Sequence, residues 1–152
     1  MFDPHTIMFD PSKTRSQRIA DGFYGKVHEW ITEEHFPSAP TVPSQPYEMT
    51  IELLRVDQQM TTRLINERTV RFAHVPLTID FLLALGEQYP EIQRNFPVVA
   101  LGSGDRCDGN SRDRFPCLIA RDGRRDLTWS GPTACWKEDV RFLVSRVDAP
   151  LC

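Results

Sequence analysis

The sequence of 152 residues lacks the short motifs that identify many enzymes. It contains no Gly-x-Ser-x-Gly sequence of a serine hydrolase and no Gly-Lys-Ser or Gly-Lys-Thr sequence of a phosphate-binding loop. Its four cysteines form no Cys-x-x-Cys pair, and no histidine accompanies them at the spacing of zinc ligands. We therefore predict no catalytic residue, no metal ion and no other cofactor.

Long apolar runs and a strong charge of one sign are also missing. No run of about 18 apolar residues occurs, so no segment is expected to span a membrane. The first residues include Asp3, Pro4 and His5 where a secretory signal has a basic and then an apolar stretch, so we expect a cytoplasmic protein. The net charge of -3 gives no general attraction for nucleic acids or anionic membranes. The predicted partner is another protein or a second copy of the chain in a homo-oligomer.

The hydrophobic and charged residues, in contrast, are present in ordinary amounts. They make up 40% and 26% of the chain, which is typical of soluble globular proteins. A chain of this length can bury enough apolar surface to fold without metal ions or disulfides.

The most distinctive stretch is residues 36–46, in which Pro37, Pro40, Pro43 and Pro46 recur at every third position. Each proline fixes its own φ and disfavours a helical residue before it. The polyproline II helix has three residues per turn, so the four prolines would lie along one edge of an extended rod. We predict a stiff linker here, between a part at 1–35 and a body at 47–152. A ligand for SH3-type grooves is the alternative, but the basic flanking residue that such ligands generally need is missing.

Before this linker, an amphipathic helix is predicted over residues 12–35, because its apolar residues recur every three or four positions. The repeated Phe-Asp-Pro at the start of the chain is expected to be unstructured. The helix needs a partner for its apolar stripe, and the linker would let it reach another subunit. The predicted partner-binding residues are Phe23, Val27, Trp30, Ile31, Pro37, Pro40, Pro43 and Pro46.

Strands and helices are mixed in the predicted body. Strands are predicted at 47–53, 70–74, 96–101, 115–120 and 125–129, and helices at 57–68, 76–86 and 136–147. Asp122-Gly123 indicates a tight turn between the last two strands, and a strand is the alternative for the last helix. The predicted fold class is α+β: an antiparallel sheet with two or three packed helices, preceded by the N-terminal helix on its extended Pro-rich arm.

The loop at 102–114 is the best local candidate for chemistry, because long loops within a hairpin are usually functional or mobile. Its candidate residues are Asp105, Asp108, Asp113, Arg112 and Arg114. The aspartates offer oxygen ligands to a hard cation, but the interleaved arginines would repel it. The near balance of charges also argues against nucleic-acid binding.

Two smaller groups of residues are further candidate sites. His74 could act as a general base oriented by Asp80, although a histidine between a strand and a helix is more often simply hydrogen-bonded. Trp129, Cys135 and Trp136 are interpreted as core or interface residues rather than as a cofactor site.

The sequence therefore favours a non-enzymatic protein that binds a protein partner or belongs to an assembly. A subunit of a viral or phage particle and a small inhibitor or immunity-type binder would both fit. Docking would use the N-terminal helix and the arm. The alternative is a small enzyme, or a nucleotide-binding or nucleic-acid-binding protein, that uses the 102–114 loop with His74 and Asp80.

Overall fold

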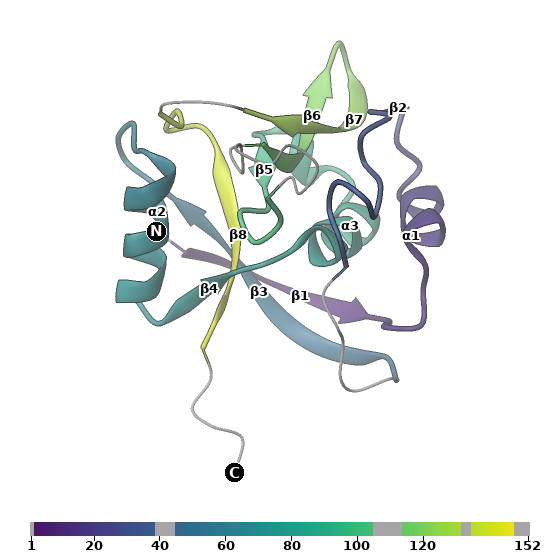
Figure 1. Cartoon of the computed structure of the whole chain (residues 1–152), viewed down its shortest axis with the longest axis horizontal. Helices are drawn as coiled ribbons and strands as arrows, with labels where there is room; N and C mark the ends of the chain where they lie inside the picture. The colour runs from purple at the N-terminus through teal and green to yellow at the C-terminus, as the bar shows by residue number, and fades with distance from the viewer. Residues whose placement is uncertain (1, 39–44, 105–113, 132–134, 148–152) are drawn as a thin grey trace.

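The computed structural model describes residues 2–38, 45–104, 114–131 and 135–147. Within these ranges the chain forms an eight-stranded sheet with three α-helices packed around it (Figure 1). The α+β class is confirmed. The sheet is mixed rather than antiparallel, because β5 runs parallel to β8 and β2 runs parallel to β7.

Strands and helices alternate irregularly along the chain. The strands are β1 (Phe2–Phe9), β2 (Lys26–Val27), β3 (Tyr47–Arg55), β4 (His74–Pro76), β5 (Val98–Val99), β6 (Phe115–Arg121), β7 (Arg124–Ser130) and β8 (Arg141–Arg146). The helices are α1 (Arg15–Gly22), α2 (Thr62–Arg71) and α3 (Ile79–Gln88), with a short 3-10 helix, η1, at Ile92–Arg94. The order in the sheet is β1-β3-β8-β5-β6-β7-β2, and β4 also pairs with β8.

The first residues of the chain form the strand β1, so the prediction of an unstructured start is wrong. β1 pairs antiparallel with β3 along its whole length, and it buries Ile7 and Phe9 on one face of the sheet. Its outer edge is closed by side chains: the Gln88 amide bonds both the N–H and the C=O of Met8, at 2.8 and 2.7 Å. The Tyr89 hydroxyl donates to the Thr6 carbonyl at 2.8 Å.

The predicted helix over residues 12–35 is correct only for α1, which begins after a capping box of Thr14 and Gln17 and ends at Gly22. A Cβ at Gly22 would collide with the ring of Tyr24. The next residue, Phe23, has a left-handed backbone with φ 52°, which ends the helix. The N-terminal helix on an extended arm is therefore not found, because α1 packs on α3 of its own chain.

The predicted helix over 136–147 is also wrong, and the alternative strand is correct. β8 lies inside the sheet, with β3 on one side and β4 and β5 on the other. Its residues Phe142, Leu143 and Val144 are all buried, Leu143 in the cluster around α3 and the other two in the cluster under α2. A strand buried on both faces has no polar alternation, and a continuous apolar run can equally be read as part of a helix.

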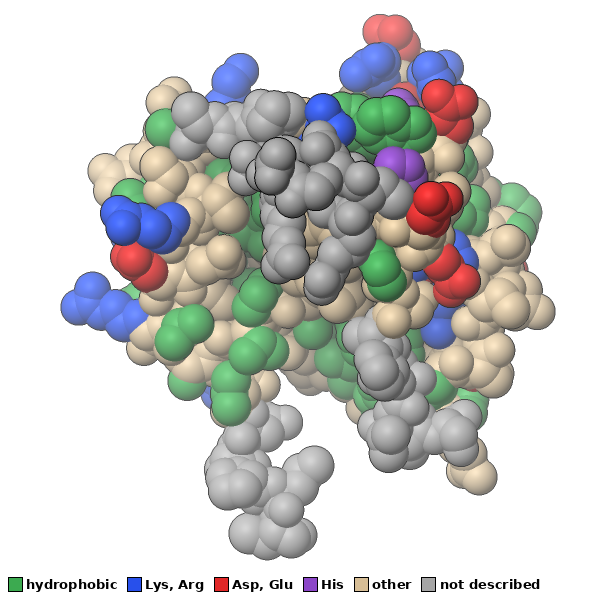
Figure 2. All heavy atoms as spheres, in the orientation of Figure 1, with side chains coloured by type: hydrophobic (Ala, Val, Ile, Leu, Met, Phe, Trp, Pro, Cys, Tyr) green, Lys and Arg blue, Asp and Glu red, His purple; other side chains and the backbone are tan. Residues whose placement is uncertain are grey.

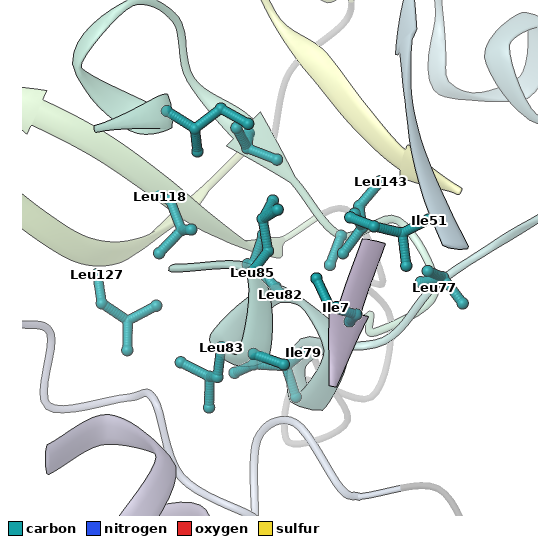
Figure 3. Packing of buried hydrophobic residues seen from close by; sticks show 14 of the residues in the cluster. Ile7, Ile51, Leu77, Ile79, Leu82, Leu83, Leu85, Leu118, Leu127 and Leu143 are labelled. Carbon is teal, nitrogen blue, oxygen red and sulfur yellow. The ribbon is translucent and has the colours of Figure 1, made fainter. Parts of the chain in front are cut away.

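Most of the core lies between α3 and the sheet. Figure 3 shows Leu82, Leu83 and Leu85 of α3 among side chains from β1, β3, β8 and the β6–β7 hairpin. A second cluster fills the other face of the sheet and includes Ile65 of α2 and Trp136. Figure 1 shows α2 on one side of the sheet and α1 and α3 on the other.

The β6–β7 hairpin is anchored to the helices by Arg125, which is buried on the α3 side. Its guanidinium donates to the carbonyl of Gly22 at 2.5 Å and to the carbonyl of Gly86 at 2.6 Å. These carbonyls belong to the last turns of α1 and α3, where a cation also complements the helix dipoles. The predicted tight turn at Asp122-Gly123 joins the two strands of this hairpin.

Candidate functional site

A pocket lies on the face of the β6–β7 hairpin that is turned away from α3. Side chains alternate along these strands, so that Leu118 and Leu127 enter the core around α3 while Cys117 and Thr128 face the opposite side. We call this the hairpin pocket, and its volume is about 350 Å³. It is lined by Pro97, Val99, Cys117, Ile119, Arg121, Thr128, Trp129, Ser130, Cys135, Trp136, Lys137 and Val140.

The lining of the hairpin pocket combines apolar and cationic groups. Val99, Trp136 and Val140 are buried and provide an apolar floor. Arg121 and Lys137 are exposed and contribute two cations to the rim. The arrangement can cover an apolar body and attract a negative group at its end.

A smaller hollow of about 100 Å³ adjoins the hairpin pocket, because both are lined by Ile119, Arg121 and Thr128. Lys26, His28, Leu127 and Asp126 complete its lining. The Asp126 carboxylate accepts two hydrogen bonds from Arg124, at 2.7 and 3.0 Å. The hydrogen bond from Arg124, together with the charges of Arg124, Arg121 and Lys26, lowers the pKa of Asp126. Asp126, the acidic side chain among the described residues of this lining, is thus already paired with Arg124. The charges of Lys26 and Arg121 remain in excess around it.

The thiol in the floor of the hairpin pocket is unsuited to nucleophilic chemistry. Burial raises the pKa of Cys117 to about 12, so this thiol stays protonated at neutral pH. Cys135, in contrast, is exposed where it lines the pocket. Trp129, Cys135 and Trp136 therefore meet around one pocket, although sequence reasoning treated them only as core or interface residues. No local pattern could have shown this, because Trp136 and Trp129 belong to different segments of the chain. They meet only because the segment before β8 lies next to the β6–β7 hairpin in the fold.

An aromatic cluster lies beside the hairpin pocket. Trp30 stacks on Trp129 with centroids 5.5 Å apart and on His35 with centroids 4.9 Å apart. The Arg114 guanidinium lies over both tryptophan rings, 5.4 and 5.0 Å from their centroids. Two residues predicted to bind a partner or a ligand, Trp30 and Arg114, thus contact their own chain.

The other predicted partner-binding residues do not form one surface. Ile31 is buried in the core, whereas Phe23 is 85% exposed and Val27 is 36% exposed. Pro37 and Pro46 are exposed. Pro40 and Pro43 lie outside the described residues, as do the loop candidates Asp105, Asp108, Arg112 and Asp113.

The pair proposed for general base catalysis, His74 with Asp80, is not formed. Both ring nitrogens of the buried His74 have other partners, the Phe72 carbonyl at 2.7 Å and the Glu52 carboxylate. Asp80 is buried elsewhere, 3.3 Å from Nε of Arg15 and 3.8 Å from Nε of Arg18.

The two arginines beside Asp80 also form hydrogen bonds to neighbouring segments, including the one that follows β2. Arg15 donates to the Phe36 carbonyl at 2.8 Å and to the Ser38 hydroxyl at 3.0 Å. Arg18 donates to the Asp10 carbonyl at 2.7 Å. Asp80 therefore has a structural role in holding α1 and its neighbouring segments on α3.

The described residues hold no metal centre and no membrane-spanning helix. Within them, no three His, Cys, Asp or Glu side chains gather closely enough to hold a metal ion. None of the helices in these ranges has the length and apolar character needed to cross a membrane. Comparison with protein-family models, with curated proteins and with solved structures found no match to this chain.

Proposed function

We propose that the protein is a non-catalytic binding protein whose hairpin pocket holds a small anionic molecule with an apolar body. The observation that carries the proposal is the apolar floor of Val99, Trp136 and Val140 beside the two rim cations, Arg121 and Lys137. The volume of about 350 Å³ lies at the lower end of the usual range for ligand pockets, roughly 300 to 1,000 Å³.

The chemistry of the lining supports binding rather than catalysis. Among the described residues that line the hairpin pocket, no side chain is a carboxylate or an imidazole. The Cys117 thiol is held in its protonated form. A general base is the group that a hydrolase or transferase would need at this place.

The proposal keeps the non-enzymatic role expected from the sequence but moves it away from the N-terminal helix. That helix is α1, and it is already packed on α3. The hairpin pocket lies instead on the face of the sheet turned away from α3.

The test compares two fluorescent probes that share one aromatic skeleton. Anilinonaphthalene sulfonate carries a negative charge, and N-phenylnaphthylamine has the same rings without it. If the rim cations recognise the anion, Arg121→Gln and Lys137→Gln weaken sulfonate binding by about fivefold each, which corresponds to about 1 kcal/mol. Binding of the neutral probe is expected to stay unchanged in both variants.

The control variant is Arg63→Gln, because Arg63 is an exposed arginine of α2 that pairs with Glu67 and does not line the hairpin pocket. Unfolding midpoints of all variants verify that the fold is retained. The proposal is wrong if the sulfonate and the neutral probe lose affinity equally, or if Arg63→Gln weakens sulfonate binding as much as the two pocket variants.

A further inference from the structure

The helix α2 exposes apolar side chains on its outer surface. It buries Ile65 and Thr69 against the sheet, but its neighbouring residues remain accessible. Val70 is 70% exposed, Phe72 is 46% exposed and Leu64 is 41% exposed. Single exposed apolar residues are common, but Leu64 and Val70 of α2 and Phe72 at its C-cap together form an apolar patch that extends over two sides of the helix and calls for an explanation.

Two shallow grooves follow the sides of this helix. One, of about 770 Å³, is lined in part by Val70, and the other, of about 420 Å³, is lined in part by Leu64 and Phe72. Glu67 and Arg71 line both grooves and form the ridge between them. A ridge flanked by two grooves is the shape against which a second helix packs its own ridges.

The charges around the patch are mainly positive. The exposed Arg63 lies 3.9 Å from Glu67, and the half-buried Arg68 lies 3.9 Å from the exposed Asp57. Both are long ion pairs of little energetic weight. Arg71 has no ion pair among the described residues. Figure 2 shows basic side chains and an acidic one over α2 at the left of the molecule, with hydrophobic side chains gathered below them.

We infer that this surface, formed by Leu64, Val70, Phe72 and the arginines Arg63, Arg68 and Arg71, docks an acidic amphipathic helix of a partner protein. The apolar face of that helix covers the exposed Val70 and Phe72, and its flanking carboxylates pair with the arginines. The length of α2, 10 residues or about 15 Å, is enough to contact about three turns of a partner helix.

A second copy of the chain is a poorer occupant of the same surface. A two-fold contact would pack α2 against the α2 of the second copy, so that the surface carrying Arg63, Arg68 and Arg71 would face a surface with the same three arginines. Docking by strand addition is also disfavoured at β1, because Gln88 and Tyr89 occupy its outer edge. The charges thus favour a different, acidic protein.

The probe for this inference is a synthetic peptide of about 14 residues, with leucines at one helical face and glutamates elsewhere. Its control has the same leucines with lysines in place of the glutamates. Binding to the full chain is followed by fluorescence anisotropy. The glutamate peptide is expected to bind, and the lysine peptide is expected not to bind.

Two surface variants then locate the contact. Val70→Asp and Arg71→Glu are expected to weaken binding of the glutamate peptide at least about tenfold, or about 1.4 kcal/mol. The control, Arg121→Glu in the hairpin pocket, is expected to leave peptide binding unchanged, which separates this inference from the proposed function. Val70 and Arg71 are both exposed, so both variants are expected to fold.

Four outcomes would overturn the inference. Equal binding of the two peptides, or binding of neither, would exclude an acidic helix as the occupant. A dimer in light scattering that Val70→Asp dissociates would identify a second copy of the chain. Sedimentation of the chain with vesicles of anionic lipid, abolished by Arg71→Glu, would identify a membrane surface.

Discussion

Arg125 offers the sharpest test of how the hairpin is held, because one side chain bonds the ends of two helices. In Arg125→Met a chain of similar length replaces the guanidinium, while the carbonyls of Gly22 and Gly86 lose their donors inside the protein. A hydrogen bond to a charged donor contributes about 1.5 to 3 kcal/mol, so removing both should lower the free energy of unfolding by about 3 to 6 kcal/mol. The contact of the guanidinium with the Tyr24 ring, 5.0 Å from its centroid, is largely replaced by the methionine thioether.

Arg125→Lys separates the hydrogen bonds from the charge. An ammonium group at this position keeps the positive charge but lacks the planar fork that reaches two carbonyls in fixed directions. We expect it to lose about half of what methionine loses, since one of the two bonds can be kept. The matched control is Arg121→Met on the neighbouring strand, where an exposed side chain should change stability by less than about 0.5 kcal/mol.

The measurement is urea unfolding followed by tryptophan fluorescence, with the slope of the free energy against urea compared among variants. An unchanged slope shows that the difference in midpoint reports stability alone. A loss below about 1 kcal/mol in Arg125→Met, where two bonds would predict several times more, would refute the reasoning. So would a lysine variant no more stable than the methionine variant.

Three further predictions concern single residues. Phe23 is 85% exposed at φ 52°, so Phe23→Gly should raise the free energy of unfolding by about 1 kcal/mol in urea, and a decrease would mean that the ring makes contacts that matter. The pKa of Asp126 is lowered below its ordinary 3.8 by the bond from Arg124, so its stabilising contribution is complete above that pH and is lost as the pH falls through the folded pKa. Melting temperatures should therefore fall less between neutral and acid pH in Asp126→Asn than in the unmodified protein; parallel curves would contradict this. A maleimide reagent followed by peptide mass spectrometry should modify the exposed Cys135 in the native protein and reach Cys117 only after denaturation, and early modification of Cys117 would show that the pocket floor opens.

Sequence reasoning succeeded where the signal was local. The alternation through residues 47–53 identified β3, and Asp122-Gly123 identified the turn of the hairpin, because both patterns depend on neighbouring residues. The apolar run in β8 was assigned to a helix, because the strands that bury both of its faces come from distant parts of the sequence.

The end of α1 and the hairpin pocket could not be predicted for the same reason. Helical periodicity continues past Gly22, and only the left-handed backbone of Phe23 shows where the helix stops. The pocket combines β6 and β7 with the segment that contains Trp136, whose backbone pairs with Met60 in an isolated bridge outside the strands. No pattern within any of these segments indicates that they share a cavity.

The side chains along β1 have a consequence for aggregation. In an antiparallel pair every second residue of an edge strand directs its N–H and C=O away from the partner strand. In β1 these residues include Pro4, Thr6 and Met8: Gln88 and Tyr89 bond the backbone of Met8 and Thr6, and Pro4 has no N–H to offer. Another chain therefore finds few free donors or acceptors there from which to extend the sheet. Fraying of the last turn of α3 would uncover this border without unfolding the rest. We therefore expect the resistance of the native protein to edge-to-edge association at β1 to depend on a helix end that contributes no strand at all.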